Sequence, residues 1–211
     1  MRQEPVSVLL LGIGNLLWAD EGFGVRVVEE LDRRFTFPAG VRLLDGGTQG
    51  IYLVQDIRET DLLVVFDAID YGLAPGTLKL IEGDDVPAFL GAKKMSLHQT
   101  GFQEVLAMAQ MLGDYPKHLL LVGVQPAQLE AFGGSLTPET KAQIEPAIGA
   151  ALAYLAQFGI QPTLRAAAPQ EDLTAELSLA RYEAERPTEE LACRTGDERI
   201  LARLDLARTG S

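Results

Sequence analysis

The sequence has a single cysteine and only two histidines among its 211 residues. One cysteine, Cys193, excludes an intramolecular disulfide and any metal site built from Cys-x-x-Cys pairs. Basic residues are also scarce, since 18 Lys and Arg stand against 30 Asp and Glu, which gives a net charge of −12 at pH 7. Nucleic acids and anionic membrane surfaces repel such a chain, so we expect neither as its main partner.

Long hydrophobic runs are missing as well. No apolar stretch approaches the roughly 20 residues that a membrane-spanning helix needs. The first residues lack the basic region and long apolar core of a signal peptide, and the short apolar run over residues 6–11 is typical of a strand. With its single cysteine, the chain is predicted to be cytoplasmic. Its length allows one sizeable domain with an appendage.

The most informative stretch is residues 6–34. The apolar run over 6–11 predicts a strand covered on both faces, and Gly12 and Gly14 allow a sharp turn after it. Apolar spacing then predicts an amphipathic helix over about 22–34. Asp20 and Glu21 stand just before this helix. In one interpretation, both acids stabilise the helix through the dipole at its N-terminus, and Asp20 caps its first turn. In the other, one of them faces a cleft at the carboxyl end of the strand, where open α/β sheets bind ligands.

The rest of the chain alternates strand and helix patterns. Strands are expected at 41–45, 62–68, 77–81 and 119–124, and helices at 51–58, 100–112 and 137–158, with Thr137 as N-cap and Pro138 as first helical residue. This alternation predicts a single three-layer α/β domain over residues 1–161, with a twisted, mostly parallel sheet of about five strands and helices on both faces. Composition changes after Pro162, so residues 162–211 are expected to form an extension that is partly helical or disordered.

Two familiar kinds of site fit the sequence poorly. Gly12 and Gly14 after a strand, with Asp45 ending the next strand, suggest a dinucleotide site. The third glycine of that fingerprint is missing, since Leu17 occupies its position, and the acids that follow would repel a pyrophosphate. A nucleophilic serine or cysteine fits less well still, because Cys193 lies in the extension and no Gly-x-Ser-x-Gly elbow is present.

A third candidate combines Glu21 after the first strand, Asp67 at the end of the third, and His98 in the long connection over residues 82–99. Two carboxylates and an imidazole suit a borderline divalent ion such as nickel or zinc and leave coordination positions open. Acids at strand ends are also often solvated or capping, and a lone loop histidine is commonly incidental. Asp45 ends the second strand at the same edge, either as a turn-forming acid or as a residue that contacts the metal ligands without binding the metal. His118 is expected to be a surface or structural residue.

Five motifs in order indicate a family. They are Gly12-x-Gly14-Asn15-x-Leu17-x-x-Asp20-Glu21-Gly22-x-Gly24, Asp45-Gly46-Gly47-Thr48, Phe66-Asp67-Ala68, His98-Gln99 and Leu121-Val122-Gly123-Val124-Gln125-Pro126. Over residues 6–160 the chain resembles the hydrogenase maturation endopeptidases. Its extended C-terminus is similar to the subgroup that serves membrane-bound uptake hydrogenases.

The resemblance implies an endopeptidase that removes the C-terminal peptide of a nickel–iron hydrogenase large subunit precursor after nickel insertion. It implies that Glu21, Asp67 and His98 bind the metal and carry catalysis. One hypothesis is that the substrate supplies the nickel, and the alternative is that the enzyme holds its own ion and recognises the loaded precursor by shape. Other divalent ions are expected to be able to occupy the site in vitro. Such chemistry needs no protein nucleophile, because a metal both polarises the amide carbonyl and activates water. The alternative is a non-catalytic chaperone that holds the nickel-loaded subunit through the same acids.

Overall fold

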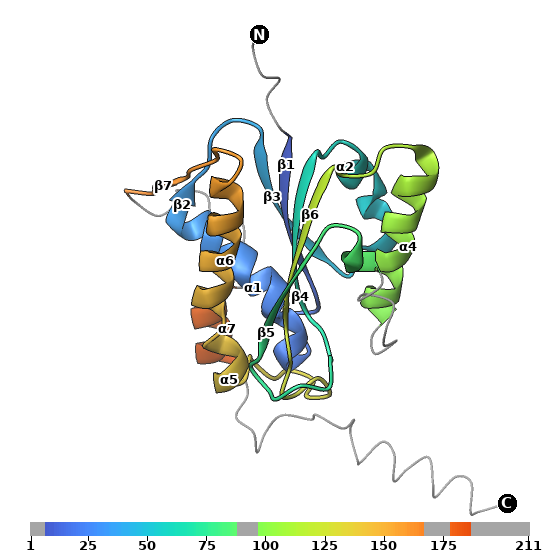
Figure 1. Cartoon of the computed structure of the whole chain (residues 1–211). Coiled ribbons are helices and arrows are strands. Elements are labelled where there is room, and N and C mark those ends of the chain that lie inside the picture. The colour runs from blue at the N-terminus through green and yellow to red at the C-terminus, as the bar shows by residue number, and fades with distance from the viewer. Residues whose placement is uncertain (1–6, 88–96, 167–177, 187–211) are drawn as a thin grey trace, which may run out of the picture.

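The computed structural model describes residues 7–87, 97–166 and 178–186, with the side chains of residues 97–101 excepted. Figure 1 shows how the helices and strands are arranged. In the element names that follow, η marks a 3₁₀ helix. They are β1 (Val8–Ile13), η1 (Ala19–Gly22), α1 (Phe23–Arg34), β2 (Phe35–Thr36), β3 (Val41–Gly47), η2 (Gly50–Leu53), α2 (Val54–Arg58), β4 (Leu62–Ala68), β5 (Leu78–Glu82), α4 (Leu97–Leu112), β6 (His118–Val124), α5 (Pro138–Lys141), α6 (Ile144–Ala156), β7 (Thr163–Leu164) and α7 (Leu179–Glu185).

The central sheet has the strand order β3-β1-β4-β6-β5. Its first four strands run parallel, as predicted, and β5 pairs with β6 in the antiparallel sense. The reversal follows from chain length, because a parallel crossover needs a dozen or more residues and only residues 69–77 separate β4 from β5. The chain therefore turns back at the edge where β1, β3, β4 and β6 all end, which we call the carboxyl edge.

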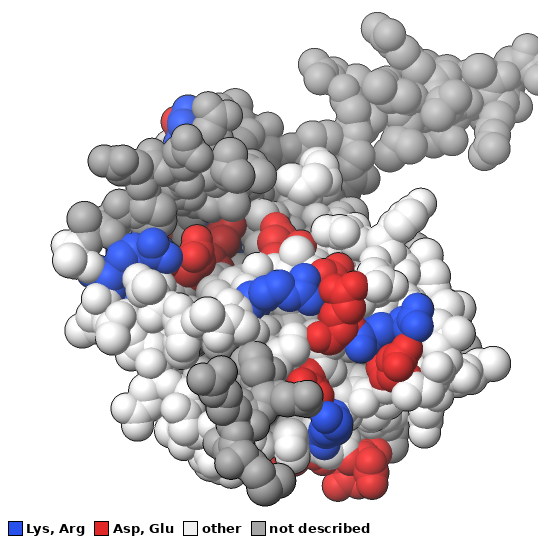
Figure 2. Space-filling view, turned by 90° about the horizontal axis from the view of Figure 1, so that it is seen from above, with Lys and Arg blue, Asp and Glu red and all other residues white. Residues whose placement is uncertain are grey.

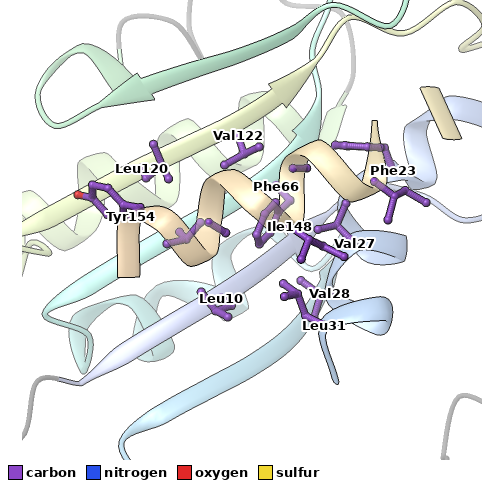
Figure 3. Packing of buried hydrophobic residues seen from close by; sticks show 14 of the residues in the cluster. Leu10, Phe23, Val27, Val28, Leu31, Phe66, Leu120, Val122, Ile148 and Tyr154 are labelled. Atoms are coloured by element: carbon purple, nitrogen blue, oxygen red, sulfur yellow. The ribbon is translucent and has the colours of Figure 1, made fainter. Parts of the chain in front are cut away.

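Alternate residues of the central strands face opposite helical layers, since side chains in a strand have a period of two. Leu10, Phe66 and the other strand residues on the same face of the sheet pack with α1 and α6 in one buried cluster, part of which Figure 3 shows. Leu11 and Val65 belong to a second buried cluster, between the sheet and the layer of α2 and α4. The two clusters confirm the three-layer architecture. They also place Asp67, which follows Phe66, on the side of the sheet that α4 covers.

Two helices differ from the prediction. The helix expected over 137–158 is divided into α5 and α6. Pro146 explains the division, because in one continuous helix its ring would clash with the carbonyl of Ala142, whereas it is tolerated in the first turn of α6. The predicted start of α5 is confirmed, with the Thr137 hydroxyl accepting the N–H of Thr140 at 3.4 Å. The helix expected over 100–112 begins earlier, at Leu97, so His98 lies in the first turn of α4 and not in a loop.

Part of the segment after Pro162 lies against the domain. β7 pairs antiparallel with β2, a short strand that the sequence did not predict. The guanidinium of Arg165 continues this contact by donating to the carbonyl oxygen of Asp32 at 3.1 Å. Further along this segment, α7 is a short helix. Cys193 lies outside the described residues.

The opposite end of the sheet, where the strands begin, carries paired charges. Figure 2 views this end of the molecule and shows acidic and basic side chains next to one another. In the segments that precede β4 and β6, a nitrogen of Arg58 lies 2.6 Å from an oxygen of Asp114, and Nζ of Lys117 lies 2.7 Å from an oxygen of Asp61. Exposed pairs of this kind contribute about 0–1 kcal/mol each to stability.

No helix in the part of the chain that the structure describes is both long and apolar enough to cross a membrane.

Candidate functional site at the carboxyl edge

Glycines bring the acidic turn onto the sheet. Gly14 has a φ of +135°, and a Cβ atom at this position would lie 1.8 Å from the carbonyl oxygen of Glu21. A Cβ atom on Gly24 would lie 2.1 Å from the carbonyl oxygen of Phe66. Only glycine allows such approaches. The backbone of Glu21 is therefore held against the end of β1, and the start of α1 is held against β4 one residue before Asp67.

These contacts bring the two predicted acids to the same edge. Glu21 lies half-buried in η1, where its N–H donates to the carbonyl oxygen of Trp18 at 2.9 Å. Asp67 is fully buried near the end of β4, and its Oδ1 accepts the N–H of Ala68 at 2.8 Å. A buried carboxylate at a strand end, with a second carboxylate on the adjacent turn, is an arrangement that suits a divalent cation.

His98 is placed by its backbone alone. α4 has 16 residues, so it is about 24 Å long, and it leads into the beginning of β6 at the opposite end of the sheet. Its first turn, with His98, therefore lies toward the carboxyl edge. The His98 side chain is outside the described part of the chain. Within that part, no three His, Cys, Asp or Glu side chains gather closely enough to hold a metal, so the three-ligand set stays a prediction.

Asp20 has a different role from the cap that the sequence suggested. Neither η1 nor α1 has a side-chain cap. The fully buried Asp20 carboxylate instead accepts the N–H groups of Ala127, Gln128 and Thr137 at 2.8, 2.9 and 2.7 Å, and the Thr137 hydroxyl lies 3.0 Å from both oxygens. Asp20 thus fastens the turn that carries Glu21 to residues 125–137, which we call the β6–α5 loop.

Gln125 organises the neighbouring loop over residues 69–77. Its side chain is buried, and its Oε1 accepts the N–H groups of Tyr71 and Leu73 at 2.8 and 3.1 Å. Its Nε2 donates to Oδ1 of Asp70 at 3.0 Å. The sequence showed Gln125 only as part of a motif. The available signal was an amide side chain directly after a fully apolar strand, where burial requires hydrogen-bond partners.

Tyr71 lies close to Asp67, which the sequence did not suggest. A Cβ atom on Gly123, the residue opposite Asp67 in β6, would lie 2.2 Å from the Tyr71 hydroxyl oxygen. Burial, and then the negative charge of Asp67, raise the pKa of Tyr71 well above its ordinary value. The Tyr71 hydroxyl therefore remains protonated over the physiological range. This neighbour depends on a glycine in another strand, so no local pattern announces it.

The other two residues considered from the sequence differ in their surroundings. Asp45 lies near the end of β3 at the carboxyl edge. Partial desolvation raises its pKa, against the opposing effects of the Gly47 amide and the charge of Arg26. His118 begins β6 at the other end of the sheet, where its exposed ring lies 4.6 Å from the ring of Phe158. His118 is thus far from the candidate site along β6, which agrees with the surface or structural role expected for it.

The fold, together with Glu21 and Asp67, defines an α/β protein with an acidic site at the carboxyl edge of its sheet. One family model, described as hydrogenase maturation protease, matches residues 25–154, and the chain belongs to this family. The chain is 64% identical over 202 residues to the hydrogenase expression/formation protein HupM of Azotobacter chroococcum mcd 1, covering 96% of this chain and 97% of that protein. It is 62% identical over 217 residues to the hydrogenase expression/formation protein HupD of Thiocapsa roseopersicina, covering 99% of this chain and 95% of that protein.

A solved structure shows the same fold. The hydrogenase maturating endopeptidase HybD from E. coli superimposes with a TM-score of 0.73 at 42% sequence identity, covering 76% of this chain and 98% of that one. The predicted fold class and the resemblance to hydrogenase maturation endopeptidases are thereby confirmed.

Proposed function

We propose that the chain removes the C-terminal peptide of a nickel–iron hydrogenase large subunit precursor after nickel insertion. The observation that carries the proposal is the placement of Glu21 and Asp67 at one edge by the close contacts of Gly14 and Gly24. The relatives support a role in hydrogenase maturation through their names, and the HupM and HupD names favour an uptake hydrogenase as the source of the precursor.

We further propose that Glu21, Asp67 and His98 bind the nickel that the precursor carries. Carboxylate and imidazole ligands suit such an ion, and when bound it would polarise the scissile carbonyl and lower the pKa of a water molecule. The chain's own contribution is to hold the ligands. The N–H of Ala68 fixes one oxygen of Asp67, and Asp20 fixes the turn that carries Glu21.

This arrangement supplies a check on nickel loading. A precursor without nickel lacks the group that the three side chains bind, so it docks weakly and is not cleaved. The competing arrangement is a protease that holds its own divalent ion and recognises the loaded precursor by shape. The single cysteine, Cys193, supports a cytoplasmic site for the reaction.

Incubation of the metal-free protease with purified precursor tests the proposal. The precursor is prepared with and without nickel, and its mass is followed by gel electrophoresis and mass spectrometry. We expect the loaded precursor to lose a short C-terminal peptide and the nickel-free precursor to keep its mass. A stable complex without any loss of mass would instead support the chaperone alternative. Cleavage that requires metal to be added to the protease would contradict substrate-borne nickel while leaving peptide cleavage in place.

A further inference from the structure

The β6–α5 loop is held on a second side by α7. The Ser135 hydroxyl donates to Oε1 of Glu183 at 2.8 Å, and Nζ of Lys141 donates to its Oε2 at 2.7 Å. The Tyr182 hydroxyl donates to the carbonyl oxygen of Gly134 at 3.4 Å. The ion pair with Lys141 joins α7 to α5, and Figure 1 shows the two helices close to each other. Two neighbouring residues of α7 therefore contact the loop and the helix that follows it.

α7 is also docked on the body of the domain. The Tyr182 ring lies 5.6 Å from the guanidinium carbon of Arg26, whose side chain in α1 is only 3% exposed. Leu179, at the start of α7, packs against the buried cluster between the sheet and the α1 and α6 layer. Apolar, aromatic and charged contacts thus hold α7 against the β6–α5 loop, α5 and α1. They do so although the helix is short and none of its residues is buried.

A short path of contacts joins α7 to the acidic turn. Thr137, two residues after Ser135, donates its N–H and hydroxyl to Asp20. A second connection runs beside it, since the N–H of Gly133 donates to the carbonyl oxygen of Leu17 at 2.7 Å. Movement of the β6–α5 loop therefore acts directly on η1, where Glu21 follows Asp20.

We propose that α7 braces the candidate site, with Tyr182 and Glu183 as positioning residues that hold the β6–α5 loop and, through Asp20, the turn that carries Glu21. The inference rests on the proposed function and adds a role for part of the segment after Pro162.

Glu183 is ionised where the brace operates. Partial burial opposes ionisation, but hydrogen bonds from Lys141 and Ser135 outweigh it and lower the pKa of Glu183 below its ordinary value. The pair with Lys141 is partly exposed, so it contributes little to global stability. A change at Glu183 should therefore act on the position of the loop and leave the fold intact.

Glu183→Gln in the full-length chain tests the brace, with Glu185→Gln as the matched control. Glu185 lies on the same helix, and its 2.8 Å bond is with Arg181 within that helix. We expect Glu183→Gln to speed amide hydrogen exchange over residues 127–137 by about 3- to 10-fold, the scale of one lost hydrogen bond, and to lower kcat for precursor cleavage by a similar factor. KM and the urea midpoint should stay at wild-type values. Tyr182→Phe should give a smaller change of the same kind.

Several results would overturn the brace. The brace is refuted if amide hydrogen exchange over residues 127–137 is equally fast in Glu183→Gln and Glu185→Gln. An equal loss of kcat in the two variants would refute it as well. Faster exchange with an unchanged kcat would show that the loop does not position the site. If the wild-type chain cleaves no precursor, the proposed function fails, while the exchange comparison still decides whether α7 holds the loop.

Discussion

Replacement of Asp20 by asparagine tests how the acidic turn is fixed. The buried carboxylate accepts three backbone N–H groups and the Thr137 hydroxyl. The amide oxygen of asparagine offers only two lone pairs, and its NH₂ group would face donors, so at least two of these bonds are lost. A hydrogen bond to a charged group contributes about 1.5–3 kcal/mol, so we expect the free energy of unfolding to fall by about 3–5 kcal/mol.

Urea unfolding followed by circular dichroism measures this loss for Asp20→Asn. Asp114→Asn is the matched control, since Asp114 is exposed and its side chain pairs with Arg58 at the surface. The control should change the free energy of unfolding by less than about 1 kcal/mol. An unchanged midpoint for Asp20→Asn, or an equal loss in the two variants, would refute the clamp between η1 and the β6–α5 loop.

Three further predictions follow from particular contacts. Gly24→Ala forces a methyl group toward the Phe66 carbonyl and should cost about 3 kcal/mol in urea unfolding, whereas Gly149→Ala, whose added methyl meets nothing within 4 Å, should gain about 0.5–1 kcal/mol. Gln125→Leu removes the side-chain acceptor of the Tyr71 and Leu73 N–H groups, so limited proteolysis should cut residues 69–77 faster than in the wild type. The pKa of Glu183 is lower in the folded chain than its ordinary value of 4.5, so its contribution to α7 docking is fully present above pH 4.5 and is lost as the pH falls through the folded-state pKa. Amide hydrogen exchange in the wild type and in Glu183→Gln should therefore become equal at that low pH.

Much of the fold could be predicted because its main signals are local. Strands such as β4 and β6 are buried on both faces, and the sequence of such a strand is a continuous run of apolar residues. The N-cap at Thr137 followed by Pro138 is likewise a local pattern, and the structure confirms it. The two acids could be assigned to one edge because parallel strands place their carboxyl ends together.

Other features depend on partners that are remote in the sequence. Asp20 looks like a helix cap from its neighbours, but its donors come from residues more than a hundred positions away. α7 has few apolar positions, and its docking relies on Lys141 and Arg26 from other helices. The direction of β5 depends on the length of the preceding loop and on its pairing with β6. No periodicity in the local sequence records any of these.

The claim that three separate side chains act at one edge is tested most directly by the rate of precursor cleavage in single variants. Glu21→Gln, Asp67→Asn and His98→Ala are each compared with wild type and with Asp114→Asn, using nickel-loaded precursor under single-turnover conditions. We predict that each of the three lowers the cleavage rate by at least about 100-fold while remaining folded by circular dichroism, and that Asp114→Asn cleaves normally. Cleavage at the wild-type rate by any one of the three would contradict the account.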